Sequence, residues 1–80
     1  MEIRISNLNR TTTEKDVRKH FSGYRIMLTT QVRTLSEGLK AKMGTFCFIS
    51  IDNRVEGEAA IKALNGSSLL DSTIMVQEGK

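Results

Sequence analysis

The chain has 80 residues, enough for one domain with a modest core. A chain of this length buries only about 60–65% of the surface it exposes when unfolded, which excludes a second lobe. Twelve Lys and Arg against nine Asp and Glu give a net charge of +3. This mild basic bias suits a polyanionic partner, but it is also common among proteins that have none.

The composition also indicates a compartment. Cys47 is the single cysteine, which excludes an internal disulfide and fits a reducing environment. The apolar stretches are too short to cross a bilayer, and Met1 leads directly into a predicted strand rather than into a secretory leader. We therefore expect an intracellular protein, cytoplasmic or, in a eukaryote, nuclear, with no membrane partner.

A strand and a helix are predicted at the start of the chain. Ile3–Ser6 alternates between apolar and polar residues, as a half-buried strand does. A threonine with an acidic residue three positions later can cap the helix that follows. Two pairs have this spacing, Thr11 with Glu14 and Thr13 with Asp16. The helix is expected to run to about Ser22, with Val17 and Phe21 facing inward.

Two further strands are predicted in the middle of the chain. Ile26–Arg33 alternates again, and its expected inward residues are Ile26, Leu28, Thr30 and Val32. After a polar loop over Ser36–Ala41, the segment Gly44–Ile51 alternates strictly. One of its faces carries Thr45, Cys47, Ile49 and Ile51. The other face carries Phe46, Phe48 and Ser50.

The last third predicts a helix and a strand. Asn53, with Glu56 three residues later, can cap a helix that ends at Asn65-Gly66. Its expected inward residues are Gly57, Ala60, Ile61 and Leu64. In the final strand Ile74 and Val76 are expected to point inward, and Thr73, Met75 and Gln77 lie on the other face.

The order strand, helix, strand, strand, helix, strand predicts an α+β fold, a ferredoxin-like βαββαβ sandwich over residues 1–80. Its four-stranded antiparallel sheet would have both helices on one face. Two amphipathic helices can cover the face that bears Cys47 and Ile49. No segment remains to cover Phe46 and Phe48, whose rings could then stack nucleotide bases.

Four segments, in this order and spacing, resemble the RNA recognition motif family over about residues 2–77. Ile3–Leu8 is similar to the six-residue motif of its first strand, and Gly44–Ile51 to the eight-residue motif of its third. Glu14–Phe21 resembles its first helix, and Ala60–Gly66 the end of its second.

The resemblance assigns roles to particular positions. The stacking aromatics of the family's third strand fall on Phe46 and Phe48. Its third aromatic falls on Arg4, and the basic residue that opens its eight-residue motif falls on Gly44. Lys42 shares the parity of Phe46 and Phe48, so it could supply this charge from two residues earlier.

We therefore expect the chain to bind single-stranded RNA, and single-stranded DNA more weakly. Two or three bases would cross the sheet, with Arg4, Arg33 and Lys42 near phosphates. No acidic residue is expected on this face of the strands. The residues predicted to contact RNA are Arg4, Ser6, Gln31, Arg33, Lys42, Phe46, Phe48, Ser50, Met75 and Gln77.

Catalysis is not expected, and neither a cofactor nor a metal is. The chain has no metal-ligand spacing and no nucleophile–base pair. Acyl-phosphate hydrolases have the same sheet order, but they need a glycine-bearing anion loop after the first strand, and residues 8–12 contain no glycine. The alternative function is a protein-interaction or self-association module that uses the same apolar face.

Overall fold

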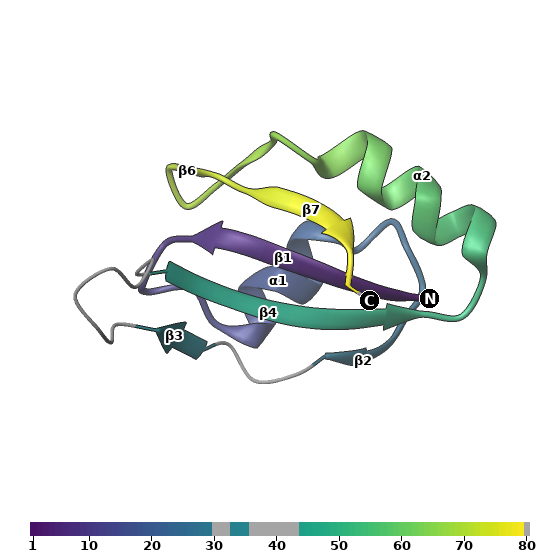
Figure 1. The fold of residues 1–80 in the computed structure, drawn as a ribbon, viewed down its shortest axis with the longest axis horizontal. Coiled ribbons are helices and arrows are strands. Elements are labelled where there is room, and N and C mark those ends of the chain that lie inside the picture. The colour runs from purple at the N-terminus through teal and green to yellow at the C-terminus, as the bar shows by residue number, and fades with distance from the viewer. Residues whose placement is uncertain (30–32, 36–43, 80) are drawn as a thin grey trace.

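The main sheet is antiparallel, and its strands lie side by side in the order β2-β4-β1-β7 (Figure 1). The computed structural model describes residues 1–29, 33–35 and 44–79. The central strands are β1 (Glu2–Leu8) and β4 (Gly44–Ile51), and β7 (Met75–Glu78) forms one edge. At the other edge, β2 (Ile26–Thr29) and β3 (Arg33–Leu35) both pair with β4 and share one strand position.

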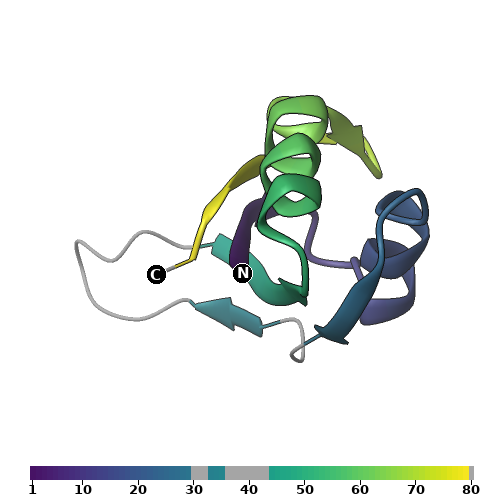
Figure 2. The ribbon, with the colours of Figure 1, turned by 90° about the vertical axis from the view of Figure 1, so that its right-hand side faces the viewer.

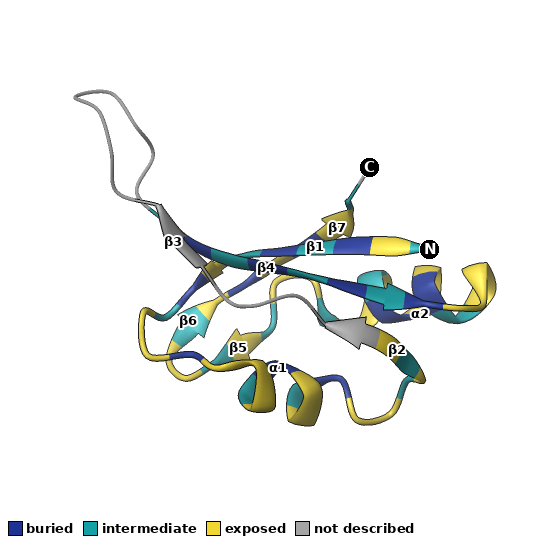
Figure 3. Cartoon of the chain, turned by 90° about the horizontal axis from the view of Figure 1, so that it is seen from below, coloured by how far each residue is buried: buried dark blue, intermediate teal, exposed yellow. Residues whose placement is uncertain are grey.

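Two helices cover one face of this sheet and confirm the predicted α+β sandwich (Figure 3). The helix α1 (Glu14–His20) lies near β2, and α2 (Arg54–Leu64) lies near β7 (Figure 2). No helix in the described part of the chain is long and apolar enough to span a membrane.

The polar residues before each helix act as caps. At α1 the pair is Thr13 with Asp16: Thr13 Oγ1 accepts from the Asp16 N–H at 3.3 Å, and Asp16 Oδ2 accepts from the Thr13 N–H at 2.9 Å. At α2, Asn53 Oδ1 accepts from the N–H groups of Val55 and Glu56. The Glu56 carboxylate does not return to the cap residue but accepts from the Arg25 N–H.

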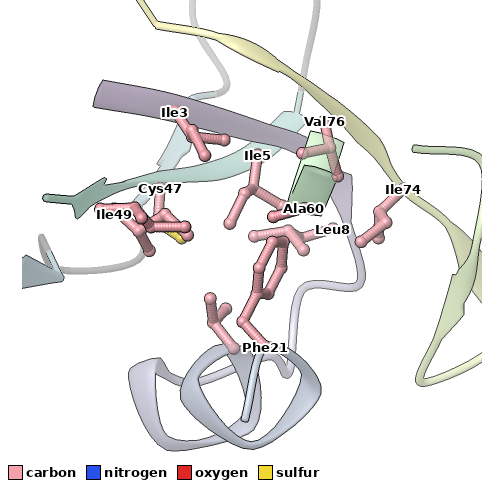
Figure 4. Packing of buried hydrophobic residues seen from close by; sticks show 11 residues of the cluster. Ile3, Ile5, Leu8, Phe21, Cys47, Ile49, Ala60, Ile74 and Val76 are labelled. Atoms are coloured by element: carbon pink, nitrogen blue, oxygen red, sulfur yellow. The ribbon is translucent and has the colours of Figure 1, made fainter. Parts of the chain in front are cut away.

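The core lies between the sheet and the helices and follows the predicted alternation. Phe21, the C-cap residue of α1, is fully buried and points toward the sheet among Ile5, Leu8 and Ala60 (Figure 4). The α1 helix ends about two residues earlier than expected, but Phe21 keeps its inward position. The other buried apolar residues are Ile3, Val17, Cys47, Ile49, Ile51, Ile74 and Val76.

A bulge changes the alternation at the end of β1. Ile5 pairs with Cys47 but Leu8 pairs with Thr45, so β1 contains one extra residue between these pairs. Asn7 has a φ of 60° there, a left-handed conformation that asparagine tolerates better than most residues. The extra residue returns Leu8 to the core, where it is 6% exposed.

The continuous strand predicted over Ile26–Arg33 is wrong in its detail. The register shifts by one residue between Ile26, which pairs with Ile51, and Leu28, which pairs with Ser50. The alternation of inward and outward residues therefore does not continue without a break from Ile26 onward. Thr30 and Val32 lie outside the described residues.

A short hairpin, which was not predicted, precedes the final strand. Its strands are β5 (Ser68–Leu69) and β6 (Ser72–Thr73), joined by Leu70 and Asp71, which both have positive φ. Positive φ at both central residues is the signature of a type I′ turn, for which Asn-Gly is the usual sequence signal. The Asn9 side chain ties this turn to the segment after β1 by donating to the Leu70 carbonyl oxygen at 3.0 Å.

Candidate functional site

The sheet face opposite the helices, called the open face below, is left uncovered by every described element (Figure 3). Side chains of alternate residues along β1, β4 and β7 reach this face, while the residues between them are buried. Its members on these three strands are Glu2, Arg4, Ser6, Phe46, Phe48, Ser50, Met75 and Gln77. The strand pattern therefore brings aromatic, cationic and polar groups together on one surface.

Phe46 and Phe48 form the centre of the open face. They lie one pleat apart on β4, and both are half-buried, in contrast to the fully buried Cys47 between them. Their ring centroids are 6.1 Å apart and the rings are perpendicular, the edge-to-face arrangement that aromatic pairs favour. Both rings were assigned to this face from the sequence.

Arg4 packs against this aromatic pair. The β1–β4 register places Arg4 opposite Phe48, and its guanidinium carbon lies 5.6 Å from the centroid of the Phe46 ring. This distance is within the range of a cation–π interaction, which is worth about 0.5–1 kcal/mol at an exposed site. Arg4 thus adds a flat, charged group to the surface at the position where the family resemblance would place a third aromatic.

An acidic residue also lies on the open face, so the expectation that this face carries none is wrong. Glu2 shares the parity of Arg4 on β1 and pairs with Ser50 of β4. The alternation of β1 was traced from Ile3 onward, and extending it by one residue would have placed Glu2 beside Arg4. Glu2 therefore contributes a carboxylate next to the aromatic pair.

Gly79, just beyond β7, was also missed. Its N–H donates to the Glu2 carbonyl oxygen at 2.8 Å, which extends the β1–β7 pairing by one residue. A Cβ atom at this position would lie 3.1 Å from Phe48 Cδ2 and 3.2 Å from Glu2 Cγ. These short distances, with the Arg4 backbone nitrogen also 3.2 Å away, show that Gly79 packs closely against Phe48 and Glu2 and that a side chain at this position would be crowded.

The β7 side of the open face is more exposed than its centre. Met75 pairs with Ser6 and is 52% exposed, and Gln77 pairs with Arg4. These residues add an apolar side chain and an amide that can both donate and accept hydrogen bonds.

The structure brings together seven of the ten residues predicted to contact RNA: Arg4, Ser6, Phe46, Phe48, Ser50, Met75 and Gln77. The β3–β4 register pairs the backbone of Arg33 with that of Phe46. Gln31 and Lys42 lie outside the described residues, so the predicted cationic contribution of Lys42 stays a prediction.

Two other features of the described residues do not form a reactive centre. Burial, with a smaller contribution from the charge of Glu14, raises the pKa of the Cys47 thiol to about 11, so this thiol is protonated at neutral pH. A hollow lined by Arg25, Asp52, Asn53 and Glu56 lies at the start of α2. Asn53 caps the helix there and Glu56 holds the Arg25 backbone, which gives both side chains a structural role.

The comparisons with known proteins agree with this geometry. The family model described as RNA recognition motif matches residues 3–75. A comparison with curated protein sequences found no match.

Solved structures show the same fold. The Mip6 RRM3 domain is 26% identical with a TM-score of 0.79, and the match covers 99% of this chain and 92% of that one. The Pes4 RRM3 structure is 24% identical with a TM-score of 0.77, covering 99% and 90%. A structure of the Rna15 RRM with bound RNA (GU) is 12% identical with a TM-score of 0.76, covering 99% and 82%.

Proposed function

Because the chain belongs to the RNA recognition motif family, we propose that its open face binds single-stranded RNA by stacking bases on Phe46 and Phe48. The observation that carries this proposal is the perpendicular Phe46–Phe48 pair on a sheet face that no described element covers. The family is generally one of RNA-binding, non-enzymatic domains, and a structural neighbour, the Rna15 RRM, was solved with RNA. We propose that this chain likewise binds RNA without catalysis, inside the cell.

The proposed contacts follow the layout of the open face. Bases stack on the Phe46 and Phe48 rings, and the Arg4 guanidinium extends this surface from its place above Phe46. Arg33 and Lys42 supply cations for phosphates. Ser6, Gln31, Ser50, Met75 and Gln77 shape the selection of bases, and single-stranded DNA binds more weakly.

A chemical-shift titration with a short RNA of mixed sequence tests this proposal directly. We expect the amide shifts to change mainly in β1 and β4, where the aromatic pair and Arg4 lie. Changes confined to the exposed faces of α1 and α2, or no changes at millimolar RNA, would overturn the proposal.

The salt dependence of RNA affinity should be shallow. Two to four cations can reach phosphates, and each neutralised phosphate of a single strand contributes about −0.7 to the slope of log affinity against log salt. We therefore expect a slope of roughly −1 to −3 in a fluorescence anisotropy titration from low to moderate salt. An affinity that does not change with salt would indicate stacking alone or a protein ligand.

The Arg4→Tyr variant separates two roles of Arg4. Its position over Phe46 favours the stacking role, so a tyrosine ring should bind RNA as well as the wild type or better, with a slightly shallower salt slope. If Arg4 instead binds a phosphate, the tyrosine variant should bind RNA more weakly, and its salt slope should become shallower by about 0.7. A tenfold weaker Kd with an unchanged circular dichroism spectrum would contradict stacking.

A second candidate function is protein binding or self-association through the open face. The 52% exposure of Met75, beside two half-buried phenylalanines, favours it. Amide shifts that change with protein concentration in the absence of RNA, and that map to β4 and β7, would support self-association. Concentration-independent shifts from 20 µM to 1 mM would contradict it.

A further inference from the structure

Glu2 and Phe48 meet at one point of the open face. The Gly79 Cβ position described above is 3.1 Å from Phe48 Cδ2 and 3.2 Å from Glu2 Cγ, so these two side chains converge on the same small volume. Because residue 79 is glycine, the chain after β7 can pack this closely against both side chains. A base stacked on Phe48 would therefore have one edge close to the Glu2 carboxylate.

Charge decides what kind of group this position can accept. The Arg4 guanidinium lies over Phe46, and both ion pairs found within residues 1–29, 33–35 and 44–79 involve Arg54, with Glu58 and with Glu78. Glu2 therefore has no ion pair with another described residue, and its Cγ lies near the Phe48 ring. An ionised carboxylate repels a phosphate but attracts hydrogen-bond donors.

The chemistry of a carboxylate distinguishes the four bases. An ionised carboxylate only accepts hydrogen bonds, and its two oxygens can accept from two neighbouring donors at once. Guanine carries two adjacent donors on its Watson–Crick edge, the imino N1–H and the amino N2–H. Adenine and cytosine place an acceptor nitrogen beside their single amino group, and uracil places a carbonyl on each side of its single N–H.

We propose that Glu2 selects guanine at the position stacked on Phe48. Its carboxylate would accept hydrogen bonds from the N1–H and N2–H groups of the base. Gly79 lies against both side chains, which keeps the Glu2 side chain beside the Phe48 ring. This inference rests on the proposed RNA binding and adds to it the identity of one base and the residue that selects it.

The test uses four hexauridine-based RNAs in which one central base is guanine, adenine, cytosine or uracil. A well-placed two-bond contact to a base gives roughly fivefold to a hundredfold discrimination. We expect wild-type protein to bind the guanine RNA tighter than the other three by a factor in this range. Glu2→Gln, which keeps the shape but replaces one acceptor oxygen by a donor, should lose this preference and bind the uridine RNA unchanged or slightly better.

Two further variants make the result specific. Glu58→Gln removes the same charge from the exposed side of α2, and it should leave the guanine preference intact. Gly79→Ala adds a methyl group that crowds Phe48 and Glu2, and the shift of these side chains should reduce the preference for guanine more than it reduces binding of the uridine RNA. Thermal unfolding of each variant checks that the fold is retained.

The outcomes separate this inference from the proposed function. A guanine preference that persists in Glu2→Gln, or a wild type that binds all four RNAs equally, overturns the role of Glu2 while RNA binding stands. If Glu2→Gln increases the affinity for all four RNAs equally, Glu2 only repels the RNA charge, and its role in selecting guanine is also overturned. If the wild type binds none of the four RNAs, the proposed function fails together with the inference.

Discussion

Phe48→Ala is expected to weaken RNA binding about fivefold to a hundredfold while leaving the fold intact. Stacking of a base on an aromatic side chain is worth roughly 1–3 kcal/mol by alanine substitution. Phe48 is half-buried on the open face, so its loss removes a stacking surface but little of the core. Isothermal titration or fluorescence anisotropy with a short RNA measures the change in Kd.

Phe46→Ala should fall in the same range but toward its lower end. In the free protein the Phe46 ring already holds the Arg4 guanidinium, a contact worth about 0.5–1 kcal/mol that a base must share or displace. Removing the ring also releases Arg4 for a phosphate, which offsets part of the loss.

The control for both variants is substitution by tyrosine, which keeps a ring in place. Phe48→Tyr should bind RNA nearly as well as the wild type. Both alanine variants should lose about 1 kcal/mol of stability or less, which corresponds to roughly 4–8 °C in a domain of this size. Unfolding of both alanine variants at room temperature would show that the two faces of β4 are assigned the wrong way round.

Phe21→Ala is expected to have the largest effect on stability. Phe21 is fully buried and extends from the end of α1 into the centre of the core (Figure 4). Replacing a buried phenylalanine by alanine costs about 3–5 kcal/mol, because the lost burial adds to the cavity left behind. At roughly 0.05–0.15 kcal/mol per residue, the whole chain has only about 4–12 kcal/mol of stability.

The variant should therefore unfold at least about 12 °C below the wild type, or be largely unfolded at room temperature. Thermal and urea unfolding followed by circular dichroism measure this change. Phe21→Leu, which leaves a smaller cavity, should lose clearly less. Phe46→Ala provides the matched comparison, because it makes the same substitution on the opposite face of the sheet. Equal stability losses at positions 21 and 46 would contradict the burial difference.

Local patterns in the sequence were enough to predict the fold class and the centre of the site. The strict alternation of Gly44–Ile51 assigned Cys47 and Ile49 to the core and Phe46 and Phe48 to the other face, as the structure shows. This prediction succeeded because successive side chains of a strand point to opposite faces, and the two helices of the described residues cover only one of these faces.

Features that depend on register could not be predicted from alternation. The bulge at Asn7 returns Leu8 to the core against its parity, and the shift after Ile26 interrupts the predicted second strand. A bulge depends on how two distant segments pair, and the sequence of one segment carries only a weak signal for it. The hairpin at Leu70 and Asp71 was missed because its turn lacks the usual Asn-Gly signal.

The sequence alone therefore determined which strands and helices form and which side of β4 carries the aromatic pair. The tertiary structure decided what surrounds that pair: Arg4 above Phe46, and Glu2 and Gly79 beside Phe48. These contacts join β1, β4 and the end of β7, which lie far apart along the chain. Their geometry depends on the strand register and on the side-chain conformations that the folded sheet permits, and neither is encoded in a local pattern.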